Sequence, residues 1–313
     1  MWIYFLRRTV LAIAIVAIAV TLLRVMIHAV PGDPAVMMLG PRATPALIAE
    51  FREKMGLNEP FHVQMVTFFA NLLKGDMGTD VFTGRSVTQI VMEQFPYTVE
   101  LIFTSVGWAA LVGIPLGCYS AIRRNTLFDK ITGIASVGTI SIPSFVMALY
   151  ALLIFAVGLG WLPAVGAGEG TLGDRLHHLI LPSLAVGIPW VGYTARIVRA
   201  SMLEVLGENH VRMARAFGLP EMRIIFRYAL PIAILPTITL LGVGVAYLLS
   251  AAVFAEVIFA RPGIGSLIVN AVDERNYPIV MGCVLVTTVL IVVATMISDF
   301  VNALLDPRAR EGL

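Results

Sequence analysis

Six stretches of this sequence are each long and apolar enough to cross a lipid bilayer as a helix. A spanning helix needs roughly 20 mostly apolar residues. The stretches are Thr9–Val30, Val99–Ile122, Ile131–Val157, Leu179–Val198, Ile232–Phe259 and Ile279–Leu305. Their apolar residues do not alternate as in barrel strands, and a helix satisfies its own backbone polar groups in lipid. The sequence therefore predicts an all-α membrane protein of about six transmembrane helices.

The composition agrees with a bilayer as the solvent. Of 313 residues, 58% are hydrophobic and 13% are charged, which leaves too little polar surface to cover a soluble globule. The net charge of +2 gives no indication of nucleic-acid binding. Cys118 and Cys283 lie in apolar stretches without metal-ligand spacing, so we expect no redox or metal role for them. The first apolar run is too long for a signal peptide, so we expect an uncleaved first span.

Basic residues in the short connections predict the orientation, because they collect on the cytoplasmic side. These residues are Arg7, Arg8, Arg123, Arg124, Lys130, Arg196, Arg199, Arg212, Arg215, Arg223, Arg227, Arg308 and Arg310. We therefore expect both termini in the cytoplasm and a long external segment at 31–97. Within it, Pro45–Met55 and Phe61–Lys74 are amphipathic and are predicted to be helices near the membrane surface.

The basic segment 201–231 follows the fourth span and has a helical pattern. Its apolar residues recur every three to five positions and are Met202, Leu206, Val211, Ala214 and Phe217. This spacing predicts one amphipathic helix over Ser201–Phe217, with Glu208 and Arg212 placed for an i,i+4 ion pair. Gly218 supplies a residue that ends such a helix, and a tight turn at Leu219–Pro220 should follow.

Two interpretations of this helix stay open on physical grounds. It could lie on anionic lipid, with its arginines held by headgroups. It could instead dock on a partner protein, because Ala214 and Ala216 are small and let another backbone approach closely, whereas a lipid-binding face favours larger apolar groups. The alanines favour docking.

The run Arg212-Met-Ala-Arg-Ala-Phe-Gly218, followed by Tyr228-Ala-Leu-Pro231, resembles the EAA loop of ABC-importer permeases. Further motifs follow the order found in the permeases of dipeptide, oligopeptide and nickel importers. They are Pro31-Gly-Asp-Pro34, Gly56-Leu-Asn-Glu-Pro60, Gly75-Asp-Met-Gly78, Ser141-Ile-Pro-Ser-Phe145, Pro262-Gly-Ile-Gly265 and Asp306-Pro-Arg308. The resemblance covers nearly the whole chain. It departs at Phe217, where the family often has Lys, at Arg212, where classical loops begin with Glu, and at Asn276, where an acid is common.

The resemblance implies the type I importer permease fold in the bacterial inner membrane. The expected organisation is a first helix within 1–30, a periplasmic segment at 31–97, a core of five helices at 98–306 and a cytoplasmic tail at 307–313. The loop at 201–231 would insert into a groove of a cytoplasmic ABC ATPase. The residues expected to form this docking loop are Glu208, Arg212, Ala214, Arg215, Ala216, Gly218, Leu219, Leu230 and Pro231. A second similar permease and a periplasmic solute-binding protein would complete the importer.

The sequence contains no Walker A pattern, which a phosphate-binding loop would need. ATP and Mg²⁺ are therefore expected on the partner ATPase, with no cofactor bound by this chain. His177 and His178 lie near Asp174 and Glu169 but define no metal geometry. A membrane-embedded enzyme is disfavoured because the sequence has no GxSxG elbow. We expect a transport subunit without catalytic residues.

Ionisable residues at membrane depth are costly and indicate function. Glu256 lies late in the fifth span, and with Pro262, Gly263 and Gly265 it is a candidate for the outer gate or the translocation path. The alternative is a structural carboxylate paired with Arg261 near the interface. Interfacial or structural roles are also expected of Arg24, His28 and Asp299. Glycines within the spans, such as Gly117 and Gly244, predict close helix contacts.

The leading hypothesis for the function is ATP-driven uptake of peptides. Permeases of the same pattern also carry nickel chelates, glutathione and other small solutes, so nickel or small-solute import remains an alternative. A self-contained channel or secondary transporter is the alternative from a different class. It would need buried charges or broken half-helices at matched positions of two repeats, and the sequence contains no inverted repeat.

Overall fold

The computed structural model describes residues 2–29, 35–36, 43–54, 58–80, 82–168 and 170–305. Within these ranges the regular structure is helical, apart from one isolated bridge between Thr79 and Ser86. The helices are α1 (Trp2–Ala29), α3 (Pro45–Lys54), α4 (Phe61–Leu72), α5 (Val87–Ile122), α6 (Leu127–Ser141), α7 (Ser144–Ala151), η1 (Leu152–Gly158), α8 (Leu172–Leu206), α9 (Asn209–Ala216), α10 (Glu221–Arg223), η2 (Ile224–Ala229), α11 (Leu230–Ala233), α12 (Leu235–Ile258), α13 (Ile264–Asp273) and α14 (Tyr277–Leu305). The motifs at 31–34 and 306–308, part of the motif at 56–60, and Glu169 lie outside the described residues.

Four of the described helices are long and apolar enough to span a membrane: α1, α5, α12 and α14. A fifth candidate is the pair formed by α6 and the continuous α7 and η1, if the two bent parts are counted as one span. α8 contains the fourth predicted span and has 35 residues, but it is not among the candidates by length and composition. The all-helical prediction is confirmed, and four or five spans are supported by these helices.

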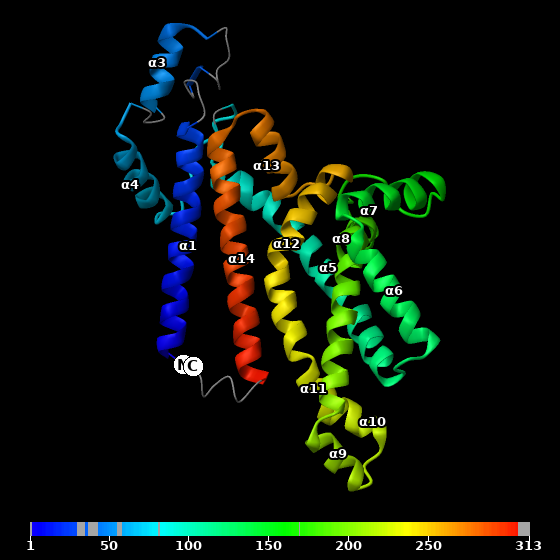
Figure 1. Ribbon diagram of the computed structural model, residues 1–313. Coiled ribbons are helices and arrows are strands. Elements are labelled where there is room, and N and C mark those ends of the chain that lie inside the picture. Colours follow the sequence, from blue (N-terminus) through cyan, green and yellow to red (C-terminus); the bar gives the residue numbers. More distant parts are fainter. Residues whose placement is uncertain are drawn as a thin grey trace.

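The third predicted span, Ile131–Val157, falls on the bent pair of α6 with α7 and η1. The chain bends by 99° between α6 and α7. The cause is Pro143, which has no N–H to continue the helix and restricts the residue before it to extended backbone. Ile142 has such a backbone, with φ −90° and ψ 121°. Figure 1 shows α7 and its continuation leading away from the bundle at an angle to α6.

Glycines bring α8 and its neighbours into close contact, as predicted. A Cβ at Gly117 of α5 would lie 2.4 Å from the Ala195 carbonyl oxygen of α8. Asp129 of α6 is buried and bonds Arg199 Nε of α8 at 2.5 Å. α5, α6 and α8 therefore form one tightly joined unit.

The two ends of the molecule differ in the elements they carry. Figure 1 shows α3, α4 and α13 at one end and α9 and α10 at the other. The start of α1 and the end of α14 lie at the α9 end, where Arg8 pairs with Asp299. This pair confirms the expected structural use of Asp299. The connections with the most basic residues thus lie at the α9 end.

The segment before α5 packs on the first helix. The two helices predicted there are confirmed as α3 and α4. Arg24 of α1 donates from Nη2 to Gln64 Oε1 of α4 at 3.0 Å, and its guanidinium lies 5.7 Å from the centre of the Phe68 ring. Arg24 therefore has partners in the protein, in place of the lipid headgroups that its position suggested. The His28 side chain lies outside the described residues.

Candidate functional site

The predicted single helix over Ser201–Phe217 is wrong, because the chain forms two helices there. α8 continues to Leu206, and its last turn closes with bonds from Gly207 N–H to Glu204 O (3.0 Å) and from Glu208 N–H to Val205 O (3.1 Å). Glu208 then has extended backbone and begins α9, since its carbonyl accepts from Arg212 N–H at 3.1 Å. Figure 1 shows α9 at the tip of the molecule, beyond the end of α8.

One face of α9 is buried on the rest of the loop. Val211 and Ala214 pack in a cluster with Val205, Ile224 and Ile225, and all five are nearly inaccessible. Ala214 was expected to let a partner's backbone approach closely, but it lies on the buried face of α9 and is 5% exposed. This apolar base fixes α9 to the end of α8 and to η2.

The other face of α9 is open and carries large side chains. Met213 is 57% exposed and Phe217 is 78% exposed, beside the exposed Arg212 and Ala216. Phe217 shares the apolar spacing of Val211 and Ala214 in the sequence, but its side chain is exposed, unlike theirs. The helix ends at Ala216, so Phe217 is no longer placed by the helical period. The structure therefore presents an outward surface with an aromatic tip, which we call the α9 outer face (Arg212, Met213, Ala216 and Phe217).

The ion pairs of the loop differ from the expected one. Glu208 lies 3.1 Å from His210 Nδ1, and Arg212 forms no ion pair with any described residue. Arg215 instead makes a two-pronged contact with Glu221 of α10, at 2.8 Å and 3.3 Å. These hydrogen bonds hold the pKa of the Glu221 carboxyl below its ordinary value. The Arg215–Glu221 contact joins α9 to α10 across the turn.

Gly218 ends α9 as the sequence predicts. Its φ is +73°, in the left-handed region, and its N–H bonds to Arg215 O at 2.9 Å. Leu219 N–H bonds to Ala214 O at 3.3 Å. These two bonds form a Schellman motif, which satisfies the last carbonyls of the helix. The turn at Leu219–Pro220 follows, and Leu230 packs on the same cluster ahead of Pro231 in α11.

Replacing Gly218 by alanine is expected to loosen the end of α9. A residue with a Cβ is destabilised by about 1 kcal/mol in a left-handed backbone conformation. The equilibrium constant for local unfolding of the end of α9 should therefore rise about fivefold. Trypsin should then cleave after Arg212 and Arg215 about five times faster in the purified chain. The control is Gly133→Ala, because a Cβ at Gly133 meets no atom within 4 Å. Equal cleavage rates in both variants would contradict this role of Gly218.

The second candidate group lies where α12 meets α13. Glu256 is fully buried, and its carboxylate accepts from Thr98 Oγ1 at 2.6 Å and from Ser266 N–H at 3.0 Å. Thr98 Oγ1 accepts in turn from Ile264 N–H at 2.8 Å. Both N–H groups belong to the first turn of α13, and the N–H groups of a first turn have no hydrogen-bond partner within the helix. Glu256 therefore caps α13 and links it to α5.

The glycines of this corner leave space for Glu256. A Cβ at Gly263 would lie 2.1 Å from the Glu256 carboxyl carbon, and one at Gly265 would lie 2.6 Å from Val253 Cα. Both glycines are buried, while Pro262 is partly exposed. The structure thus gathers all four residues of the predicted gate into one corner around the start of α13.

Arg261 does not form the expected ion pair with Glu256. Its Nη2 donates to Glu100 of α5 at 2.9 Å, and its guanidinium lies 5.8 Å from the centre of the Tyr97 ring. Only the Arg261 backbone N–H bonds to Glu256, at its carbonyl oxygen. Glu100 is 161 residues away in sequence and was not identified from the pattern. Burial lowers the pKa of Arg261 from its ordinary value.

The departure at Asn276 has a structural explanation. Its Nδ2 donates to Asp80 Oδ1 at 2.5 Å, and both residues are buried. Burial alone would raise the pKa of Asp80, but hydrogen bonds from Thr83, Asn276 and the backbone together lower it. An acid at 276 would face this carboxylate with a like charge. The amide therefore suits the contact between Asp80 and the start of α14.

Within the described residues, no group of three His, Cys, Asp or Glu side chains could hold a metal ion. His178 Nδ1 lies 3.3 Å from Asp174 Oδ1 as a pair within one helical turn. The two groups that the structure does assemble are the α9 outer face and the Glu256 corner, at opposite ends of the molecule.

Two family models match the chain. The model described as "Binding-protein-dependent transport system inner membrane component" matches residues 113–311, and its N-terminal counterpart matches residues 1–102. These two matches cover nearly the whole sequence.

Several proteins are similar over almost their full length. The glutathione transport system permease protein GsiC of Salmonella choleraesuis is 35% identical over 307 residues, which cover 98% of each chain. The oligopeptide transport system permease protein AppB of Bacillus subtilis is 35% identical over 97% of this chain and 98% of its own. The probable D,D-dipeptide transport system permease protein DdpB of Escherichia coli is 36% identical over 91% of each.

A solved structure of the MetNI methionine ABC transporter in inward-facing conformations is similar in fold. The TM-score is 0.58 at 15% identity, over 70% of this chain and 97% of that chain. At this identity the likeness supports a shared fold and carries no argument about cargo.

Proposed function

The chain belongs to the family of inner membrane components of binding-protein-dependent transport systems, and we propose that it is one permease subunit of an ATP-driven importer of peptides. The observation that carries this proposal is the similarity, over nearly the full chain, to permeases named for oligopeptides, D,D-dipeptides and glutathione. All three cargoes are short molecules with peptide or amide bonds.

The proposed topology has six spans, with both termini in the cytoplasm. α8 supplies the sixth, because 35 residues make a helix roughly 50 Å long, which exceeds the hydrocarbon core. The bent pair of α6 and α7 counts as one span. The α9 end is assigned to the cytoplasm, since the connections rich in arginine lie there. The α13 end then faces the periplasm and a solute-binding protein.

We propose that the α9 outer face docks on a cytoplasmic ABC ATPase. Its exposed apolar tip suits an apolar groove, and Arg212 remains available for an acidic rim. Because the buried face of α9 packs on α8 and η2, a movement of the ATPase that displaces α9 would also displace these two helices. ATP and Mg²⁺ belong to that partner, so this chain is a transport subunit without catalytic residues. A second similar permease completes the pathway.

The Glu256 corner is proposed as a rigid part of the outer gate. Glu256, Gly263 and Gly265 hold α13 against α5 and α12, so α13 would move with these two helices as the outer end opens or closes. Pro262 is the member of the corner that is partly exposed and can face the path.

ATP dependence tests this function against the alternative of a channel or secondary transporter. The permease should be reconstituted in liposomes with the proposed second permease, ATPase and binding protein. We expect peptide to accumulate only with ATP inside and the binding protein outside. Accumulation driven by an ion gradient without the ATPase would contradict the proposal. One bent pair is found among the described helices, whereas a secondary transporter typically has two matched breaks.

A further inference from the structure

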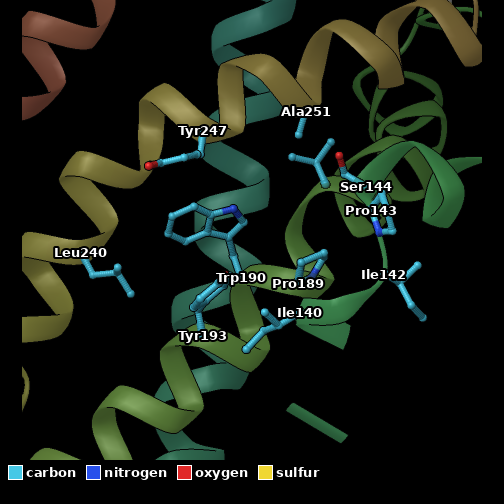
Figure 2. A pocket seen from close by; sticks show the side chains of 11 residues that line it. Ile140, Ile142, Pro143, Ser144, Pro189, Trp190, Tyr193, Leu240, Tyr247 and Ala251 are labelled. Carbon is cyan, nitrogen blue, oxygen red and sulfur yellow. The ribbon is translucent and has the colours of Figure 1, made fainter. Parts of the chain in front are cut away.

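A cavity of about 440 Å³ lies at the break between α6 and α7. Its wall comes from the break itself, from α8 around Pro189 and Trp190, and from α12 around Tyr247 (Figure 2). The volume falls in the range of small-molecule sites, which are mostly apolar with a few polar groups. Neither the predicted docking residues nor the predicted gate residues line it.

Aromatic rings form one side of this cavity. Figure 2 shows the Trp190 ring between Tyr193 and Tyr247. The ring centres of Trp190 and Tyr193 are 5.6 Å apart, and those of Trp190 and Tyr247 are 6.4 Å apart. Gly244 of α12 makes room for Trp190, since a Cβ there would lie 2.4 Å from Trp190 Cζ3. The close fit at Gly244 sets the position of the Trp190 ring.

The cavity also has a polar side, because the helix breaks there. The last turn of α6 and the first turn of α7 leave backbone groups without partners within a helix. In a membrane, such backbone is stable only inside protein or beside a water-filled cavity. Ser144, Tyr193 and Tyr247 are the lining residues with polar side-chain atoms, and Tyr247 is 70% exposed. The cavity thus offers hydrogen-bonding groups beside a broad aromatic surface.

These features select between possible occupants. A lipid chain would fill the apolar wall but would leave the backbone groups of the break without partners. A peptide can satisfy both sides of the cavity. Its amide groups can form hydrogen bonds with the backbone groups at the α6–α7 break, and an apolar side chain can lie on the Trp190 ring. An acidic or basic side chain of a peptide would find no ion-pair partner here, because none of the lining residues is charged.

We propose that this cavity is a subsite for an apolar or aromatic side chain of the transported peptide, with Trp190 as its main contact. This inference rests on the proposed peptide transport and adds a side-chain preference to it. The preference should appear as selectivity between peptides of equal length.

The test compares ATP-driven uptake of Ala-Phe-Ala and Ala-Glu-Ala by the complete importer in liposomes. Trp190→Ala should lower uptake of Ala-Phe-Ala about tenfold at limiting concentration, because the aromatic contact is lost. Uptake of Ala-Glu-Ala should change less than twofold, and Trp190→Phe should recover most of the loss. Trp161→Ala is the matched control, since Trp161 is exposed and lies outside the cavity. It should leave the ratio of the two rates unchanged.

Failures of the two claims are distinguishable. If the unmodified importer accumulates neither peptide with ATP, the proposed function fails and the subsite with it. If it accumulates both, and Trp190→Ala slows both equally or neither, the subsite alone is wrong. A photoreactive phenylalanine in place of Tyr247 gives a second measurement. An adduct with labelled Ala-Phe-Ala supports the subsite, and adducts with lipid or the second permease alone overturn it.

Discussion

ATP-driven uptake is expected to fall roughly 100-fold when Phe217 is replaced by aspartate, while the permease stays folded in the membrane. Phe217 is 78% exposed, so its loss removes little internal packing. Substitutions of exposed side chains usually change stability by less than about 0.5 kcal/mol. The effect on binding to the ATPase should be large, because an aromatic side chain buried in an interface typically contributes about 2 kcal/mol or more to the binding free energy. A carboxylate in the same groove would add the cost of desolvating its charge.

The measurement compares uptake and membrane abundance in the same liposomes or cells. Leu127→Asp is the matched control, because Leu127 is also exposed and apolar and begins α6, so it is not part of the α9 outer face. Normal uptake by Phe217→Asp would show that the α9 outer face is not a docking surface. Equal losses in both variants would indicate a general effect of the new charge.

The second large effect is expected from Gly263→Ala. The added Cβ would lie 2.1 Å from the Glu256 carboxyl carbon, so Glu256 must move and release the Ser266 N–H. Its movement also breaks the hydrogen bond from Thr98 Oγ1, which positions Thr98 to accept from the Ile264 N–H. Overpacking and the lost caps together should cost about 3 kcal/mol. The midpoint of thermal unfolding should fall by roughly 5 °C.

Thermal aggregation followed by size exclusion of the purified permease measures this change. Gly107→Ala serves as the control, because a Cβ at Gly107 of α5 meets no atom within 4 Å. A midpoint within 2 °C of the unmodified protein would contradict the account of the corner, since it would mean that the carboxylate is not held in place.

Features with local causes were predictable from the sequence. The apolar stretches located the long helices, and Gly218 ended α9 because a left-handed residue at a helix end favours glycine. Pro143 was visible too, but prolines also occur in continuous membrane helices, so the pattern could not distinguish a kink from a 99° break. Which outcome occurs depends on the neighbouring helices that cover the freed backbone.

Features with distant causes were not predictable. The pattern of Ser201–Phe217 fits a single helix, and only the packing of Val211 on Ile224 and Ile225 shows that the chain turns at Gly207. Arg261 was assigned to Glu256 because they are five residues apart, while its true partner Glu100 comes from another helix. The Trp190 cavity requires three segments to meet, and no local spacing indicates that.

Cross-linking from position 217 tests the central claim most directly, because it asks what the α9 outer face touches. A photoreactive phenylalanine at Phe217 should be activated in cells that produce the whole importer, with the same substitution at Trp161 as a control. We predict an adduct between the permease and the ATPase from position 217 and none from position 161. Adducts from position 217 with lipid alone would contradict the claim, and α9 would then be an interfacial helix.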